Sequence, residues 1–156
     1  MSGGPQANAG QGGGDALILH ASCVAIDGRA ALILGASGRG KSGLALQLMS
    51  LGAELVADDR TCLALRDCPE GPMLMADAPD RLRGLIEARG VGILYGKAVG
   101  PVPVALLVDL DEAEDSRLPP ERRRDLLGLS LPVVHMVDSP AFPAAVLQYL
   151  RQGRSA

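Results

Sequence analysis

Short runs of apolar residues alternate with glycine- and proline-bearing segments along most of this chain. Ala30–Leu34 is continuously apolar and short, which is typical of a buried strand. Gly43–Met49 has the apolar spacing of an amphipathic helix, and Gly52 stands where such a helix would end. The pattern therefore predicts a strand, a glycine-rich loop and a helix in succession.

The second half of the chain predicts two more strands and a closing helix. Val102–Leu110 and Pro132–Val137 are mostly apolar and are each predicted to be a strand. Ser139-Pro140 supplies an N-cap and first turn for a helix that runs through Tyr149. Asp111–Asp125 is charged and contains prolines, so we expect an exposed connection there. This order indicates an α/β domain with a mixed, partly antiparallel sheet and flanking helices.

A tight hairpin is predicted immediately before the glycine-rich loop. Asp27-Gly28 lies between two apolar runs, which is a strong signal for a two-residue turn. Pairing Ile26 with Arg29 and counting outward places His20 opposite Gly35, if no bulge intervenes. We therefore expect His20 to act as a proton relay or to hydrogen-bond a nearby acid, although a lone histidine is often only structural.

Length and composition favour one compact domain. The chain has 156 residues, of which 47% are hydrophobic, so there is room for one core. We expect residues 15–152 to form the domain, with a flexible glycine-rich tail over residues 1–14 and a short tail over residues 153–156.

Charge and cysteine content narrow the function classes. A net charge of −3 and an aromatic content of 2% argue against a nucleic-acid surface. No apolar run reaches the roughly 18 residues that a membrane helix needs, so we expect a cytoplasmic protein without a membrane partner. Cys23, Cys62 and Cys68 are an odd number without zinc-site spacing, which predicts reduced structural thiols.

The loop between the predicted strand and helix carries the pattern G-x-x-x-x-G-K-[ST]. Its residues are Gly35, Ala36, Ser37, Gly38, Arg39, Gly40, Lys41 and Ser42. Glycines let backbone N–H groups approach phosphate oxygens, and the helix N-terminus adds its positive dipole. We expect a nucleoside triphosphate here, with Lys41 on its β- and γ-phosphates and the Ser42 hydroxyl on Mg²⁺. A glycine-rich turn without a ligand is the alternative.

Two adjacent carboxylates, Asp58 and Asp59, follow the predicted strand Glu54–Ala57. Strand ends that meet at the phosphate edge of a sheet bring carboxylates close to Mg²⁺. Neighbouring side chains of a strand point to opposite faces, so one Asp can hold the metal through water while the other accepts a proton. A surface Asp-Asp turn is the alternative.

An acidic and a cationic residue lie two positions apart in Leu85–Ile93, a segment whose side-chain types alternate as in a strand or bend. Glu87 and Arg89 are predicted to face the same side, as an acid for Mg²⁺ and a cation for phosphate. A surface ion pair explains the spacing equally well.

Together these features resemble the catalytic domain of the HPr kinase/phosphorylase family, whose nucleotide-binding fold is similar to that of PEP carboxykinase. The resemblance rests on His20 fifteen residues before Gly35, the loop Gly35–Ser42, and the segments Leu55–Arg60 and Leu85–Ile93. It covers roughly residues 15–100, and the joint spacing is more specific than any single motif.

The resemblance implies an ATP- and Mg²⁺-dependent kinase that phosphorylates a serine of HPr, or of an HPr-like carrier, in phosphotransferase-system regulation. The implied catalytic residues are His20, Lys41, Asp58, Asp59 and Arg89, and the implied metal-binding residues are Ser42, Asp58 and Glu87. Asp59 is favoured over Asp58 as the base. A nucleotide-binding regulatory module without efficient transfer, or a small-molecule kinase, are the alternatives.

The chain also departs from longer members of that family. We expect a short form of the kind seen in α-proteobacteria, and a homo-oligomer, hexameric by resemblance. Met136–Pro143 stands where a basic loop is associated with dephosphorylation, so we expect weak or absent phosphorylase activity. The family's additional arginine falls near Glu121–Arg124, where a solvated helix start is the alternative.

Overall fold

The computed structural model describes residues 16–156, so the predicted tail over residues 1–14 lies outside the described part. Its strands are β1 Ala16–Leu19, β2 Ser22–Ile26, β3 Arg29–Leu34, β4 Glu54–Ala57, β5 Thr61–Cys68, β6 Gly71–Asp77, β7 Leu85–Ala88, β8 Gly92–Tyr95, β9 Val102–Ala113, β10 Arg122–Leu126 and β11 Leu129–Met136. The helices are α2 Lys41–Ser50, a 3₁₀ turn η1 Asp80–Leu82, and α3 Phe142–Gln152.

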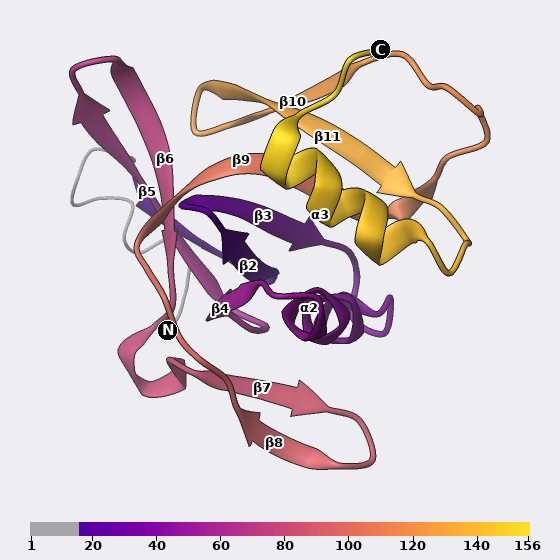
Figure 1. Cartoon of the computed structure of the whole chain (residues 1–156). Coiled ribbons are helices and arrows are strands. Elements are labelled where there is room, and N and C mark those ends of the chain that lie inside the picture. The colour runs from indigo at the N-terminus through magenta and orange to yellow at the C-terminus, as the bar shows by residue number, and fades with distance from the viewer. Residues whose placement is uncertain (1–15) are drawn as a thin grey trace.

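One mixed sheet of nine strands organises the domain, and β9 is its central strand (Figure 1). The strand order is β1-β5-β6-β9-β3-β2-β4, with the β10–β11 pair added to β9 through β11. β9 runs parallel to β3 and to β11, and antiparallel to β6. The long β9 therefore connects β3, which leads into the glycine-rich loop, to the β10–β11 hairpin.

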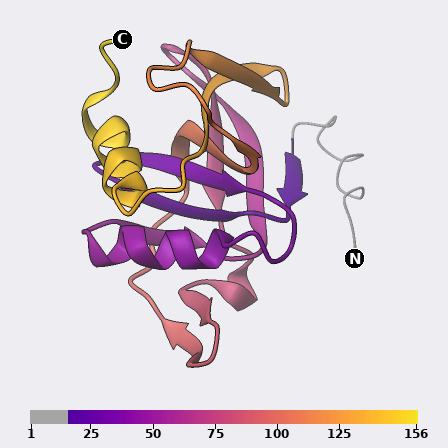
Figure 2. The same ribbon diagram turned by 90° about the vertical axis from the view of Figure 1, so that its right-hand side faces the viewer.

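The two faces of β3 bury different partners because successive side chains of a strand point to opposite sides. Ala31 and Ile33 pack in a cluster with residues of α2 and α3. Ala30 and Leu32 pack instead against residues of β5 and β6, which curl over the other face. Figure 2 shows α3 and β1 on opposite sides of the central strands. Both helices thus cover one face, and the predicted mixed sheet with flanking helices is confirmed.

The predicted hairpin is confirmed in its turn and its register. Ile26 pairs with Arg29 and Ala25 pairs with Ala30. Both turn residues are left-handed, with φ of 52° at Asp27 and 75° at Gly28, as a two-residue hairpin turn requires. This tight turn delivers β3 straight into the glycine-rich loop.

The predicted placement of His20 opposite Gly35 is wrong. The β2–β3 ladder ends at Ser22 and Ile33. Before Ser22 the chain leaves β3, and β1 pairs with β5, with Leu19 opposite Thr61. His20 therefore lies beside the residues that precede Thr61 and outside the β2–β3 ladder.

Three expectations in the second half of the chain also need correction. The segment Glu121–Arg124 does not start a helix, because β10 begins at Arg122 and pairs with β11. The last helix is not capped by Ser139: its N-cap is Ala141, and Pro143 occupies its first turn. The predicted exposed connection, 111–125, is shorter than expected, since β9 continues to Ala113.

The cysteines are unpaired, as predicted for reduced thiols. Cys23 is fully buried in β2, and this burial raises the pKa of its thiol. Burial raises the pKa of Cys62 as well, with the charge of Asp77 adding to the effect. The thiolate, which is the reactive form, is therefore disfavoured at both positions.

Replacing Leu107 by Ala tests the central position of β9. The Leu107 side chain is 0% exposed, and truncating it leaves a cavity in the cluster that β3 forms with β5 and β6. We expect the free energy of unfolding to fall by about 2–5 kcal/mol, measured by urea denaturation. The control Leu118→Ala, at a position 76% exposed, should change it little; equal losses in both variants would contradict this packing.

Candidate active site

The loop Gly35–Ser42 connects β3 to α2 with its glycines in left-handed conformations. Gly38 has φ of 86° and Gly40 has φ of 95°, values that other residues rarely adopt. A Cβ atom at either position would meet no atom within 4 Å, so both glycines border open space. Helix α2 starts at Lys41 without a side-chain cap, which leaves the N–H groups of its first turn available to an anion.

Lys41 lies inside the curve of this loop. Its Nζ donates to the carbonyl oxygens of Gly35 at 2.7 Å and Ala36 at 3.2 Å. The residue is 7% exposed, although its side chain carries a charge. The ammonium group is therefore held close to the backbone that the sequence motif assigns to phosphate.

Asp58 is the polar centre of the site. Its Oδ1 accepts hydrogen bonds from the Ser22 hydroxyl at 2.7 Å and the Ser42 hydroxyl at 2.6 Å. Its Oδ2 accepts from the backbone N–H of Glu87 at 3.0 Å. Asp58 is 7% exposed, so a buried carboxylate ties β2, α2 and β7 to the end of β4.

Asp59 has a different environment although it is the next residue. Its φ is 68°, which turns the chain sharply after Asp58. Its side chain is 57% exposed, and Oδ1 lies 2.6 Å from Nε2 of His20. The sequence predicted a contact between His20 and the acidic pair, and this contact is confirmed. The two carboxylates therefore divide into a buried one and an accessible one.

Glu87 and Arg89 occupy the β7–β8 hairpin and do not share a strand face. β7 ends at Ala88, so Arg89 lies in the turn. Glu87 contacts Asp58 through its backbone, and its side chain is exposed. Within residues 16–156, no group of three or more His, Cys, Asp or Glu side chains is arranged around a common metal position. The carboxylate in contact with the Ser42 hydroxyl is that of Asp58.

The sequence analysis missed the carboxylates that support the loop from β9. Asp111 accepts a hydrogen bond from the Ala36 N–H at 3.0 Å, and its Oδ1 lies 3.2 Å from Nε of Arg39. Asp109, 5% exposed, accepts from the backbone N–H of Asp111 at 2.9 Å and from Nη2 of Arg124 at 2.5 Å. A chain of contacts thus runs from β10 to the start of the loop.

A signal for these residues was present in the sequence. Asp109 and Asp111 alternate with an apolar residue at the carboxyl end of an apolar strand, which is where parallel sheets place ligand-binding groups. Ser22, which donates to Asp58, gave no comparable signal, since a serine at the start of a strand is common.

A cavity of about 340 Å³ opens beside the loop. One wall consists of Gly40, Gly43 and Leu44 at the start of α2. The other wall is the segment 136–143, which connects β11 to α3. The cavity is therefore adjacent to both the glycine-rich loop and segment 136–143.

A family profile described as the HPr Serine kinase C-terminal domain matches residues 15–117. The chain belongs to this family. The matched residues include the glycine-rich loop, the acidic pair and the β7–β8 hairpin.

Individual members of the HPr kinase family agree with this assignment. An HPr kinase/phosphorylase from Geobacillus sp. (strain WCH70) is 35% identical over 128 residues, which is 78% of this chain and 39% of that protein. One from Caldicellulosiruptor bescii is 43% identical over 94 residues. The chain thus spans about two fifths of the length of such relatives.

A solved structure supports the fold. The Hpr(Ser) kinase/phosphatase from Coxiella burnetii superimposes with a TM-score of 0.67 at 25% identity, covering 86% of this chain and 88% of that one. The predicted family and fold class are confirmed. Within residues 16–156, none of the helices is long and apolar enough to cross a membrane.

Removing the Arg124 guanidinium tests the chain of contacts behind the loop. Burial alone would raise the pKa of Asp109, but hydrogen bonds from Arg124 and the Asp111 backbone outweigh it and hold that pKa below its usual value. The pair therefore stabilises the fold above the unfolded-state pKa near 4, and its contribution is lost as the pH falls through the lower folded-state pKa.

We expect Arg124→Met to lower the free energy of unfolding by about 1–3 kcal/mol at pH 7, with the loss shrinking below about pH 4. Urea denaturation across pH 3–7 measures both. Arg123→Met, at an exposed pair with Glu121, is the control and should cost less than about 1 kcal/mol. An Arg124→Met loss that is independent of pH would contradict the assigned ion pair.

Proposed function

We propose that this domain is an ATP-dependent protein-serine kinase whose acceptor is HPr or an HPr-like phosphocarrier in phosphotransferase-system regulation, acting in the cytoplasm. One observation carries the proposal: Asp58 is buried against the Ser42 hydroxyl of the phosphate loop, whereas Asp59 is exposed and contacts His20. The first carboxylate suits a metal position, and the second is accessible to a hydroxyl of another protein. The names of the relatives support the choice of acceptor.

The residues at the loop fit Mg²⁺ and ATP. Mg²⁺ prefers oxygen ligands, and Ser42 and Asp58 present a hydroxyl and a carboxylate 2.6 Å apart. Bound between these groups and the nucleotide, Mg²⁺ would neutralise charge that develops on the transferred phosphoryl group. Lys41 supplies a second positive charge, and the first turn of α2 supplies N–H donors. Glu87, whose backbone N–H contacts Asp58, is proposed as a further metal-binding residue on the family resemblance.

Asp59 is the proposed general base. Its contact with His20 uses Oδ1, so Oδ2 can accept the proton of the acceptor serine. His20, 2.6 Å from this carboxylate, is proposed to position it. Arg89, at the turn of the β7–β8 hairpin, is proposed to contact phosphate on the acceptor side of the site.

The nucleoside is proposed to lie in the cavity beside the loop, between α2 and segment 136–143. Its volume of about 340 Å³ is within the range of small-molecule sites. The same segment contains no Arg or Lys. We therefore propose that dephosphorylation of the carrier by inorganic phosphate is weak or absent.

Transfer of ³²P from γ-labelled ATP to the HPr-like carrier of the same genome tests the kinase. Lys41→Ala should reduce transfer by at least about 100-fold, because it removes charge stabilisation of the transition state. Asp59→Asn should reduce it by about 10²–10⁴-fold while ATP binding, measured by calorimetry, is retained. Asp67→Asn, at an exposed position of β5, is the matched control and should leave transfer unchanged.

Different results would redirect the assignment. Full transfer by Asp59→Asn would exclude this carboxylate as the base. ATP binding by the unmodified domain without transfer to the carrier would favour a nucleotide-binding regulatory module.

A homo-oligomer is also proposed, with the β7–β8 hairpin as its contact. Glu87 pairs with Ile93 and Leu85 with Tyr95, so these side chains share one face. Ile86 on the opposite face packs against α2, and Ile93 and Tyr95 are 63% and 92% exposed. Figure 1 shows this hairpin projecting from the rest of the domain. Large apolar side chains in such a position are typical of a protein contact.

Sedimentation velocity tests this contact. Ile93→Lys should reduce the oligomer to a smaller species, because a charge would be buried in an apolar interface. Leu118→Lys, on the exposed β9–β10 connection, should sediment as the unmodified protein does. A monomeric parent protein, or an Ile93→Lys oligomer of unchanged size, would contradict the proposal.

A further inference from the structure

A second cavity, of about 300 Å³, lies between α3, β11 and the β9–β10 connection. Much of its lining is apolar and includes Val133, Val134, Phe142 and Val146. None of the residues proposed for phosphoryl transfer lines it. A volume of this size is enough for a small organic molecule.

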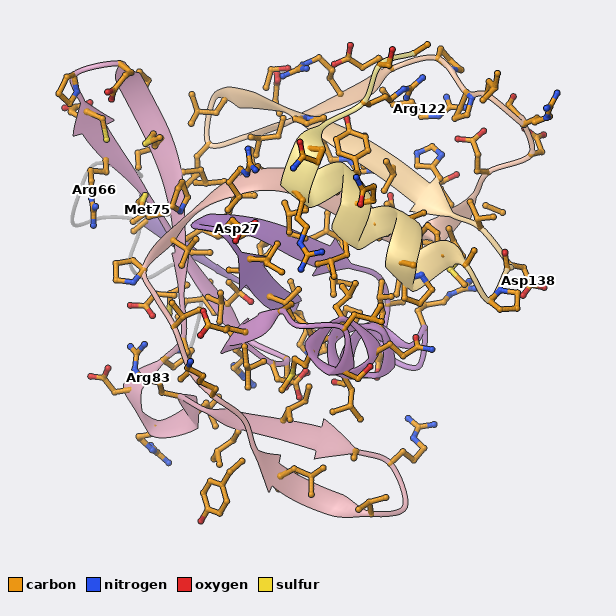
Figure 3. All side chains as sticks on the ribbon, in the orientation of Figure 1. Asp27, Arg66, Met75, Arg83, Arg122 and Asp138 are labelled. Carbon is orange, nitrogen blue, oxygen red and sulfur yellow. The ribbon has the colours of Figure 1, made fainter. Side chains whose placement is uncertain are left out.

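The polar lining of this cavity carries a positive excess. Its lining includes three arginines, Arg117, Arg122 and Arg154, and one acidic residue, Glu114. His135 also lines the cavity and lies 3.8 Å from the Glu114 carboxylate. Figure 3 labels Arg122 near the top of the view, above α3.

Glu114 does not neutralise the whole of this charge. Arg122 donates to both of its carboxylate oxygens at 3.0 Å, and these bonds hold the pKa of Glu114 below its usual value. Arg122 uses two of its five N–H groups in the hydrogen bonds to Glu114, so three N–H groups can donate to a ligand. The Glu114–Arg122 pair by itself would only fasten the β9–β10 connection to β10. It does not account for Arg117 or for Arg154, whose guanidinium donates to the Pro119 carbonyl oxygen and has no carboxylate partner among the described residues.

We propose that this cavity binds a small organic carboxylate with an apolar body. The body would lie against Phe142 and Val146, and the carboxylate would meet the arginine-bearing rim, where charge-assisted hydrogen bonds are strong. The apolar lining requires an apolar body, either aliphatic or aromatic. The excess of arginines over carboxylates in the lining requires an anionic group.

The position of this cavity allows a bound ligand to affect the neighbouring cavity beside the phosphate loop. Val137 and Phe142 line both this cavity and the one beside Gly40. A ligand that fixes these two side chains changes the wall of the neighbouring cavity, so the two sites are coupled reciprocally. This regulatory part rests on the proposed function, because it requires ATP in the neighbouring cavity; the binding part does not.

Octanoate is the probe for binding, and Tyr149 is the reporter because it lines the cavity. The chain has two tyrosines and no tryptophan, so Tyr95→Phe leaves Tyr149 as the fluorophore. We expect a saturable change of tyrosine emission with octanoate and none with octylammonium, which has the opposite charge. Equal binding of both probes, or of neither, would overturn the proposal.

Two substitutions on α3 locate the binding. Ala145→Phe fills the cavity from its rim, whereas Ala144→Phe adds the same side chain at an exposed neighbour outside it. We expect at least a tenfold loss of octanoate affinity in Ala145→Phe and little change in Ala144→Phe. Equal losses of octanoate affinity in both variants would overturn the assigned site. An Ala145→Phe protein that keeps its octanoate affinity would also overturn it.

The coupling is tested separately by calorimetry with ATP. Saturating octanoate should change the dissociation constant of ATP by about fivefold or more in the unmodified domain and leave it unchanged in Ala145→Phe. Octanoate binding with an unchanged ATP constant would refute the regulatory part alone. A domain that binds octanoate but not ATP would refute the proposed function and leave the cavity assignment intact.

Discussion

The buried carboxylate of Asp58 is the interaction on which the site depends. A charged group that is 7% exposed is unfavourable unless hydrogen bonds replace its water. Two serine hydroxyls and one backbone N–H do so, and they come from β2, α2 and β7. The same three contacts fix the phosphate loop, the acidic turn and the β7–β8 hairpin relative to one another. A single buried carboxylate therefore holds the arrangement together, and it is the group we propose for the metal.

The sharp turn at Asp59 gives this arrangement its chemistry. Because φ at Asp59 is 68°, the second carboxylate leaves the direction of β4 and meets His20 at the surface. Adjacent residues thus obtain opposite environments, one shielded from water and one open to a second protein. This separation suits the proposed kinase, in which one carboxylate would bind the metal and the other would accept a proton.

The sequence predicted the parts whose physics is local. The β2–β3 hairpin, the loop and α2 follow from a two-residue turn, glycine spacing and apolar periodicity. His20 was placed near the acidic pair for the wrong reason, because no local rule shows that β1 leaves β3 to pair with β5. Glu121–Arg124 was ambiguous since a charged run is compatible with a helix or an edge strand, and pairing with β11 decides it. Ser22 acts through a contact with a distant segment, which a single sequence does not show. For Asp111 the sequence shows the position at the end of an apolar strand but not the contact with Ala36.

The affinity of ATP with and without Mg²⁺, compared in Asp58→Asn and Asp59→Asn, tests the central division most directly. Asparagine keeps the size of aspartate but removes its charge and replaces one acceptor oxygen with an NH₂ donor, so circular dichroism and urea denaturation are used to verify that both variants fold. The account predicts that the Mg²⁺-dependent gain in ATP affinity is lost in Asp58→Asn and retained in Asp59→Asn. An unchanged gain in Asp58→Asn, or an equal loss in both, would contradict the assignment of Asp58 to the metal and Asp59 to the proton.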